Sequence, residues 1–349
     1  MMQAIEITGK HLFSVITTDL PVPADNEVVI KVSACGVCGT DIHIYNAEAP
    51  ASLPLIPGHE FGGEVVSCGK KVKRLTFGNR VAVDPNISCG VCEYCRAGRI
   101  HLCENLRAIG VTMPGGFAQY VAVPELQAYL LPDSMHAYDA AFVEPVSCCV
   151  HGMDIIDIKP GEKVVIAGSG AIGLYMLQLA KLAGASKIGI IESLPDRQAI
   201  ALQYGADFVI SPKDPVLREK IMDSMRGGPG VLIECAGSAD ALKSLLNIAP
   251  KGGRILLFGL ASKSDSAEIK LQEFFHKELK LYSSLLNPFT FQRAIDLIST
   301  GEISTKHFII QNVPIDFSEM DKVYTGKQLT GTLKNILVPH QITKQGVTL

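Results

Sequence analysis

Three segments of the N-terminal half carry side chains that could bind a catalytic metal ion. They supply one thiol, one imidazole and two carboxylates, from Cys38, His59, Glu60 and Glu144. Taken singly, each has an ordinary explanation, because a lone cysteine is usually a core residue and a lone glutamate is often a surface charge. Together they match a catalytic zinc site, in which three protein ligands leave one position open for an oxygen that the metal activates as a Lewis acid.

Two further residues beside this group could move a proton. Thr40 lies two positions after Cys38 and is the predicted first hydroxyl of a proton relay. His43 is the predicted outer base, because an imidazole with a pKa near ~6.5 can pass a proton to solvent. A structural, hydrogen-bonding histidine is the alternative for His43, and Tyr45 could contact substrate or belong to the core.

A second cluster contains cysteines alone: Cys89, Cys92, Cys95 and Cys103. Four thiolates in one short segment can enclose a zinc ion tetrahedrally, which stabilises a loop and leaves no open position for chemistry. A [4Fe–4S] cluster also uses four cysteines, but its bacterial signature has a different spacing and ends in Cys-Pro. We therefore expect a structural zinc site here.

A glycine-rich turn indicates a dinucleotide site, and its residues are Gly168, Ser169, Gly170, Ala171, Ile172 and Gly173. In such a turn the glycines allow a tight bend and close approach of a pyrophosphate, which the helix N-terminus binds. Glu192 follows Gly173 by 19 residues, where a carboxylate would accept a hydrogen bond from the adenosine ribose. Glu192 would repel a 2′-phosphate, so NAD is favoured over NADP, although Arg197 lies nearby and a simple glycine turn is the alternative.

The elements that must position these residues show two different patterns of secondary structure along the chain. Residues 1–147 contain short β-type runs cut by glycine and proline, whereas from Lys159 onward strands and helices alternate, as in a doubly wound parallel sheet. We expect a helix at Phe289–Thr300 and a strand at Leu333–Val338 to return to the first domain. Within the alternating region we expect these strands and helices: Lys163–Ala167, Ala171–Ala183, Lys187–Ile191, Pro195–Tyr204, Phe208–Ile210, Val231–Glu234 and Arg254–Gly259.

Composition restricts the class of partner. The 349 residues suggest two domains, and the net charge of −3 without any basic run argues against nucleic acid or an anionic membrane as a partner. The N-terminus has no signal-peptide pattern and no apolar run is long enough to span a membrane, so we expect a cytoplasmic protein. Clustered cysteines then indicate metal binding, not disulfides. A small-molecule substrate is the expected partner.

The combined motifs resemble the zinc-containing medium-chain dehydrogenase/reductase family, particularly its polyol (sorbitol-like) and L-threonine dehydrogenase branch. The resemblance covers nearly the whole chain and rests on Gly-Val-Cys-Gly-Thr-Asp-x-His, Gly-His-Glu-Phe-x-Gly, the four cysteines, Gly-Gly-Phe-Ala-Gln-Tyr, Glu-Pro-Val-Ser and Gly-Ser-Gly-Ala-Ile-Gly. It implies an α/β fold, with a Rossmann domain inserted in a β-rich, GroES-like catalytic domain. The expected boundaries are 1–147 for the catalytic domain with a zinc lobe at 86–106, 148–285 for the Rossmann domain, and 286–349 for the return.

The resemblance also implies an activity and its cofactors. The chain would transfer a hydride between a secondary alcohol of a small polyol, sugar acid or amino alcohol and NAD, with two zinc ions per chain. Cys38, His59 and Glu60 would hold the catalytic zinc, with Glu144 as fourth ligand or as a partner of zinc-bound water. The branch implies a homotetramer or homodimer. Three alternatives stay open: an NADP-preferring reductase of the same family, a zinc-free quinone reductase, and a non-enzymatic zinc-ribbon module.

Overall fold

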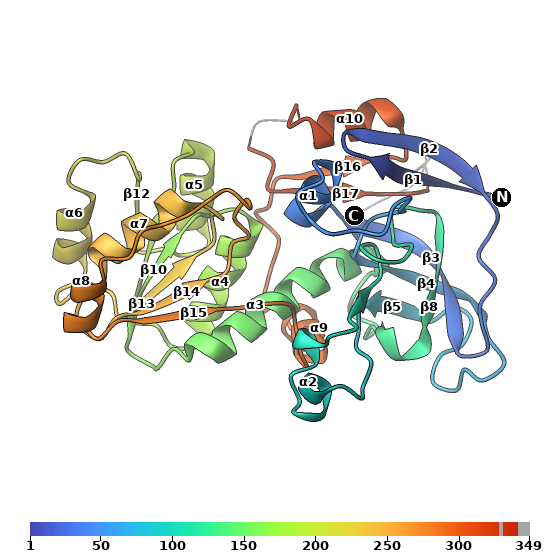
Figure 1. Cartoon of the computed structure of the whole chain (residues 1–349), viewed down its shortest axis with the longest axis horizontal. Helices are drawn as coiled ribbons and strands as arrows, with labels where there is room; N and C mark the ends of the chain where they lie inside the picture. The colour runs from blue at the N-terminus through green and yellow to red at the C-terminus, as the bar shows by residue number, and fades with distance from the viewer. Residues whose placement is uncertain (328–330, 341–349) are drawn as a thin grey trace. The chain divides into compact units, whose positions relative to one another are not determined.

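The computed structural model describes residues 1–327 and 331–340, which divide into two compact units. The first unit contains Met1–Pro145 and the described chain from Ile310 onward, and the second contains Val146–Ile309. Figure 1 shows this division along the chain, with the second unit drawn in green to orange. The first boundary lies close to the expected one at 147, whereas the chain returns to the first unit at Ile310 and not at 286. The last residues of the expected return, 341–349, lie outside the described residues.

The later return has a physical reason in the contacts of α9 (Phe291–Ser299). This helix buries one apolar face within the second unit. On its polar side, the guanidinium of Arg293 forms an ion pair with Asp154 at 2.6 Å. The segment before the helix is also tied there, because Nδ2 of Asn287 donates to Oγ of Ser147 at 2.8 Å. The predicted helix Phe289–Thr300 therefore exists as α9, but it belongs to the second unit and not to the first.

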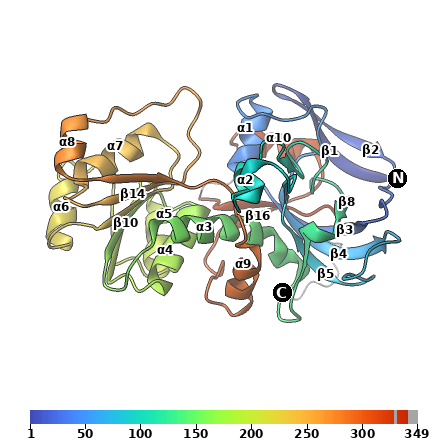
Figure 2. The same cartoon turned by 60° about the horizontal axis from the view of Figure 1, so that its bottom comes forward.

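The first unit is built from β-sheets. A seven-stranded sheet has the order β16-β17-β3-β4-β5-β9, with β8 pairing with β3, and two smaller sheets pair β1 with β2 and β6 with β7. The structure confirms the expected β-rich domain, and Figure 2 shows its strands. The strands are β1 (Met2–Gly9), β2 (Leu12–Thr18), β3 (Glu27–Gly36), β4 (Glu60–Cys68), β5 (Arg80–Val83), β6 (Asn86–Ile87), β7 (Arg107–Ala108), β8 (Tyr120–Pro124), β9 (Ala128–Leu130), β16 (Ile310–Val313) and β17 (Lys334–Leu337).

Short helices interrupt the strands of this unit, and a large apolar cluster fills most of its interior. The cluster joins strands from the N-terminal segment with α10 and β17 from the C-terminal segment, so both parts of the chain share one core. The helices are α1 (Gly39–Tyr45), α2 (Glu93–Arg96) and α10 (Phe317–Tyr324), with 3-10 turns at Ile100–Leu102, Glu125–Gln127 and Ala137–Phe142.

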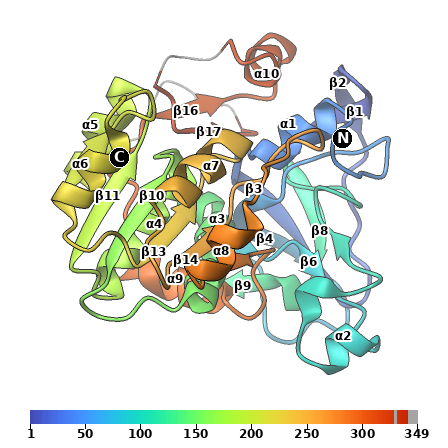
Figure 3. The same cartoon turned by 60° about the vertical axis from the view of Figure 1, so that its left-hand side comes forward.

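The second unit contains one six-stranded sheet in the order β12-β11-β10-β13-β14-β15, with every neighbouring pair parallel. Its central strands are buried on both faces, as expected for parallel strands covered by helices. This is the doubly wound Rossmann order, and Figure 3 shows the strands with their flanking helices. The strands are β10 (Lys163–Ala167), β11 (Lys187–Ile191), β12 (Phe208–Ile210), β13 (Val231–Glu234), β14 (Arg254–Leu257) and β15 (Lys280–Ser283).

The helices of the second unit confirm the predicted alternation of strand and helix. β10, β11, β12 and β13 have the predicted bounds, and α4 ends one residue earlier than predicted. Among the described residues, none of the helices combines the length and apolar character needed to cross a bilayer. The helices are α3 (Val143–Ile156), which begins in the first unit, α4 (Ala171–Leu182), α5 (Pro195–Gln203), α6 (Leu217–Ser224), α7 (Ala239–Ile248), α8 (Leu271–His276) and α9.

Candidate functional site

Three of the predicted metal ligands lie together in the first unit. The ligand atoms of Cys38, His59 and Glu60 are all within 4.8 Å of one another. Cys38 caps the N-terminus of α1, Glu60 begins β4, and His59 precedes it. Antiparallel pairing of β3 with β4 sets Gly36 opposite Glu60, which brings the two sequence segments to one place. The fold therefore assembles one thiol, one imidazole and one carboxylate.

Asp41, which was not among the predicted site residues, contacts both Cys38 and His59. The Oδ2 atom of Asp41 accepts a hydrogen bond from the backbone N–H of Cys38 at 2.8 Å, and its Oδ1 lies 3.6 Å from Nδ1 of His59. Burial lowers the pKa of His59, but the charge of Asp41 and hydrogen bonds with Asp41 and Cys38 raise it well above its usual value. A carboxylate at Nδ1 orients the ring so that Nε2 is left for a metal ion.

Lys334, which was not among the predicted site residues, is a buried cation beside the same group. Its Nζ forms an ion pair with Oε2 of Glu60, and the two side chains are 8% and 2% exposed. Burial lowers the pKa of Lys334, but the charges of Glu60, Cys38 and Glu144 raise it above its usual value. Gly36 leaves space for this pair, because a Cβ there would collide with the Glu60 carboxylate.

The assembled residues fit a zinc ion. Thiolate, imidazole and carboxylate are the ligand types that zinc uses in catalytic sites with one open position. Nδ1 of His59 faces Oδ1 of Asp41 at 3.6 Å, so this pair holds the ring and leaves Nε2 for the ion. The donor set therefore favours a metal ion.

One predicted site residue, Glu144, is not part of the ligand group that was expected to hold it. Glu144 is buried, but the ligand group found in the described part of the chain contains Cys38, His59 and Glu60 without it. Glu144 nevertheless acts on Lys334 through its charge. These observations favour a role of Glu144 beside the metal ligands, and its part as fourth ligand stays a prediction.

The two residues of the predicted proton relay both lie in α1. Oγ1 of Thr40 is 3.7 Å from Sγ of Cys38. Nδ1 of His43 is 2.7 Å from Oε2 of Glu48, so a carboxylate that the sequence analysis left out orients the imidazole ring. The structure places Thr40 next to the metal ligands, and the relay itself stays a prediction.

Two other residues of this region belong to the hydrophobic core. Cys35 is fully buried among apolar side chains, where burial raises the pKa of its thiol. The ring of Tyr45 stacks on that of Tyr324 with 4.5 Å between the ring centroids. Tyr45 is also buried. The core interpretation of Tyr45 therefore fits better than a contact with substrate.

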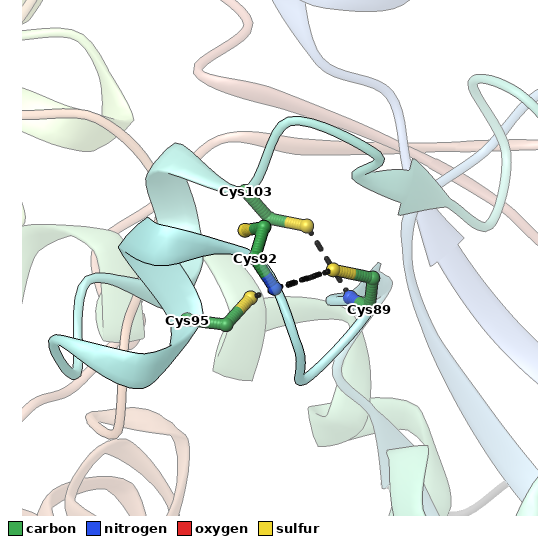
Figure 4. A group of neighbouring side chains, drawn as sticks. All are labelled: Cys89, Cys92, Cys95 and Cys103. Carbon is green, nitrogen blue, oxygen red and sulfur yellow. Dashed lines mark hydrogen bonds between the residues drawn. The ribbon is translucent and has the colours of Figure 1, made fainter.

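The four cysteines of the predicted lobe also lie together, as Figure 4 shows. All four sulfur atoms are within 4.8 Å of one another. Sγ of Cys89 and Sγ of Cys95 are 4.0 Å apart, near the ~3.8 Å expected between sulfurs of a tetrahedral site with Zn–S bonds of about 2.3 Å. Backbone N–H groups of Val91 and Cys92 lower the pKa of Cys89 to about 6, whereas burial and the neighbouring thiols raise that of Cys95 to about 11. Zinc binding requires thiolates, so the ion would have to displace the remaining protons.

The glycine turn joins β10 to α4 in the second unit. Gly168 has a φ of +95°, and a Cβ on Gly173 would collide with the carbonyl oxygen of Gly168. Both positions therefore require glycine. α4 begins after Gly170, with Ile172 in its first turn, and presents the N–H groups and positive dipole end that bind phosphate. This arrangement fits the pyrophosphate of a dinucleotide.

Glu192 follows β11 and is held against the glycine turn. Its Oε1 accepts hydrogen bonds from the backbone N–H groups of Ser193 at 2.7 Å and Leu194 at 2.9 Å, and its Oε2 accepts from that of Ser169 at 2.9 Å. Burial raises the pKa of Glu192, but these N–H groups lower it, and the net pKa is below its usual value. Glu192 is therefore a carboxylate at neutral pH.

Each of the two units contains a segment that matches a known protein family. A sequence model of the alcohol dehydrogenase GroES-like domain matches residues 24–133. A second one, described as zinc-binding dehydrogenase, matches residues 171–300. The first match covers the predicted metal ligands Cys38, His59 and Glu60 together with the four-cysteine lobe, and the second begins within the glycine turn.

Individual relatives extend these matches over most of the chain. D-arabinitol dehydrogenase 1 of Uromyces fabae is 33% identical over 87% of this chain and 88% of its own length. An L-threonine 3-dehydrogenase of Chelativorans is 38% identical over 69% of this chain and 72% of its own length. The crystal structure of a putative zinc-binding dehydrogenase from Sinorhizobium meliloti bound to NADP has a TM-score of 0.92 and 38% identity, covering 97% of this chain and 99% of that chain.

Proposed function

The chain belongs to the zinc-binding medium-chain dehydrogenase family of NAD(P)-dependent alcohol and polyol dehydrogenases, and we propose that it oxidises a secondary alcohol of a small polyol, sugar acid or amino alcohol with NAD. The observation that carries this proposal is the grouping of Cys38, His59 and Glu60 within 4.8 Å. The similarity to dehydrogenases of D-arabinitol and L-threonine supports the substrate class. Assembly as a homodimer or homotetramer stays a prediction.

In this proposal, two zinc ions bind per chain, one at the three-residue group and one at the four-cysteine lobe. Zinc at the three-residue group would lower the pKa of a substrate hydroxyl, and the nicotinamide would accept a hydride. Asp41 fixes the imidazole of His59 through Nδ1. Thr40 would accept the hydroxyl proton, and His43, oriented by Glu48, would pass it to solvent.

The preference for NAD rests on the charge of Glu192. The carboxylate is buried and held by backbone N–H groups, so it cannot easily turn away from a ligand at the carboxyl end of β11. A 2′-phosphate near it would meet repulsion of about 1–4 kcal/mol at ~4 Å, depending on the local dielectric. The uncharged ribose hydroxyl of NAD would donate a hydrogen bond to the same carboxylate.

Use of NADP is the second candidate, and two observations favour it. The similar structure from Sinorhizobium meliloti is bound to NADP. In this chain Nη1 of Arg197 lies 3.8 Å from the position that a Cβ on Gly170 would occupy, so a cation lies beside the glycine turn. A guanidinium there could pair with a 2′-phosphate. The experiment below therefore tests both cofactors.

A substrate panel tests the proposed function. The purified chain is assayed with D-arabinitol, D-sorbitol, D-gluconate and L-threonine, with NAD or NADP, by absorbance of the reduced nicotinamide. We expect at least one of these secondary alcohols to be oxidised. We also expect kcat/KM with NAD to exceed that with NADP about tenfold, because a repulsion of about 1.4 kcal/mol, within the range of about 1–4 kcal/mol given above, is a factor of ten.

The variant Glu192→Gln provides the matched control for cofactor choice. It keeps the size of the side chain and removes its charge. We therefore expect the ratio of kcat/KM with NAD to kcat/KM with NADP to decrease, while the ranking of the alcohols by kcat/KM stays the same. Oxidation of none of the four alcohols would reject the proposed substrate class. A native enzyme that prefers NADP would reject the assigned role of Glu192.

A further inference from the structure

Glu234, the last residue of β13, is a buried carboxylate that the proposed reaction does not use. Its side chain is only 2% exposed. Its Oε1 accepts hydrogen bonds from the backbone N–H groups of Ala236 and Gly237, both at 2.8 Å. Burial raises the pKa of Glu234, while the backbone N–H groups of Ala236, Gly237, Ser238 and Gly259 oppose that shift. Glu234 thus binds two loops, residues 235–238 and residues 258–260.

The two loops are in direct contact around this carboxylate. The backbone oxygen of Glu234 accepts from the N–H groups of Phe258 and Gly259, both at 3.0 Å. A Cβ on Gly259 would collide with the backbone nitrogen of Gly237 and lie 2.8 Å from Oε2 of Glu234. Gly237 itself has a φ of +67° and faces the carbonyl oxygen of Leu260. The Glu234 side chain therefore holds loop 235–238 through Oε1 and lies against Gly259 of loop 258–260 through Oε2, where the two loops meet.

The first of these loops also touches the dinucleotide turn. A Cβ on Gly168 would lie 3.1 Å from the backbone nitrogen of Ala236 and 3.2 Å from its Cα. The backbone N–H of Cys235 donates to the carbonyl oxygen of Ala167 at 2.8 Å, which extends the pairing of β10 and β13 up to the turn. Loop 235–238 therefore packs directly against the glycine turn.

Sheet order indicates which half of a dinucleotide lies above these loops. The sheet reverses its direction of winding between β10 and β13, and dinucleotides bind across the carboxyl ends of the strands at such a point. Glu192, at the end of β11, fits the adenosine ribose. The nicotinamide half then extends over the carboxyl ends of β13 and β14, from which loops 235–238 and 258–260 leave the sheet.

We propose that Glu234 is a positioning residue for the nicotinamide half of the bound cofactor. It acts through the backbone of the two loops that it binds and does not need to touch the cofactor itself. This inference rests on the proposed dinucleotide-dependent function. The role proposed for Glu234 differs from that proposed for Glu192, which acts on the adenosine half.

The proposal is tested by comparing the binding of the whole cofactor, NADH, with the binding of its adenosine half, AMP. The dissociation constants of NADH and of AMP are measured by titration calorimetry for the native chain, Glu234→Gln and Gly259→Ala. Glu234→Gln keeps the side-chain volume but places an amide NH₂ against backbone donors, and Gly259→Ala separates the loops from the other side. We expect each variant to weaken NADH binding about tenfold or more and to change AMP binding less than about twofold.

Glu162→Gln is the matched control, because Glu162 precedes β10 at the amino ends of the strands and pairs with Arg254 at 2.6 Å. This control should leave the ratio of NADH to AMP affinity unchanged. If the Glu234 and Gly259 variants weakened the binding of NADH and of AMP equally, or weakened neither, the role of Glu234 would be rejected and the proposed function would stand. If the native chain bound neither NADH nor NADPH, the proposed function would fail, and this inference with it. If one variant does not fold, the other decides by the same ratio.

Discussion

Cys38→Ser is expected to reduce alcohol oxidation at least about a thousandfold, because a Lewis acid contributes several kcal/mol to catalysis and each ~1.4 kcal/mol is a factor of ten. Cys38 lies in the first unit, whereas the glycine turn and Glu192 lie in the second, so NADH affinity should stay within about twofold. Metal analysis should show a decrease from two zinc ions to one per chain, because the four-cysteine lobe is unchanged.

Two further variants make this result specific. His59→Ala removes the second ligand and should reproduce the loss of activity and of one zinc ion. Cys68→Ser changes an exposed cysteine of the same unit and should leave activity and zinc content at native values. Full turnover by Cys38→Ser after verified loss of that zinc ion would contradict the assigned role.

Lys334→Met is expected to destabilise the first unit by about 3–5 kcal/mol, because removal of one partner leaves the other buried charge uncompensated. The partner is Glu60, whose side chain is 2% exposed. Urea unfolding with the metal removed from all samples measures this cost. Lys322→Met is the matched control, because Lys322 pairs with Glu319 at 2.6 Å on the surface, where such a pair contributes about 0–1 kcal/mol.

A double variant separates loss of charge pairing from loss of packing. Glu60→Gln removes the opposite charge, so Lys334→Met should cost much less in that background than in the native chain. The difference between the two costs is the coupling energy of the pair, which should be about 1–3 kcal/mol. Additive costs would show that Lys334 stabilises the unit by packing alone.

The second unit was the easier part to predict from sequence. β10 and β13 consist almost wholly of apolar residues, and the glycine turn marks the junction between β10 and α4. Local pattern therefore specified the strands, the turn and the position of Glu192. The end of the unit was misplaced, because the contacts of α9 with Asp154 and the link from Asn287 to Ser147 join segments more than 100 residues apart, which local pattern does not encode.

The grouping of Cys38, His59 and Glu60 was predictable from sequence, but the contacts that support it were not. Residue type identified Cys38, His59 and Glu60, since few other functions require those three side chains together. Lys334 comes from a C-terminal strand, and only the pairing of β17 with β3 brings it to Glu60. Asp41 was present in the quoted motif, and its position three residues after the helix cap was the available signal.

The central claim is that a metal ion binds at Cys38, His59 and Glu60, and anomalous scattering at the zinc edge from crystals of the native chain tests it directly. We expect two peaks per chain. One peak should lie among the four cysteine sulfurs, and the other within bonding distance of Sγ of Cys38 and Nε2 of His59, about 2.3 Å and 2.0–2.1 Å respectively. A single peak, at the cysteine lobe only, in crystals of an enzyme that oxidises alcohols would contradict the account.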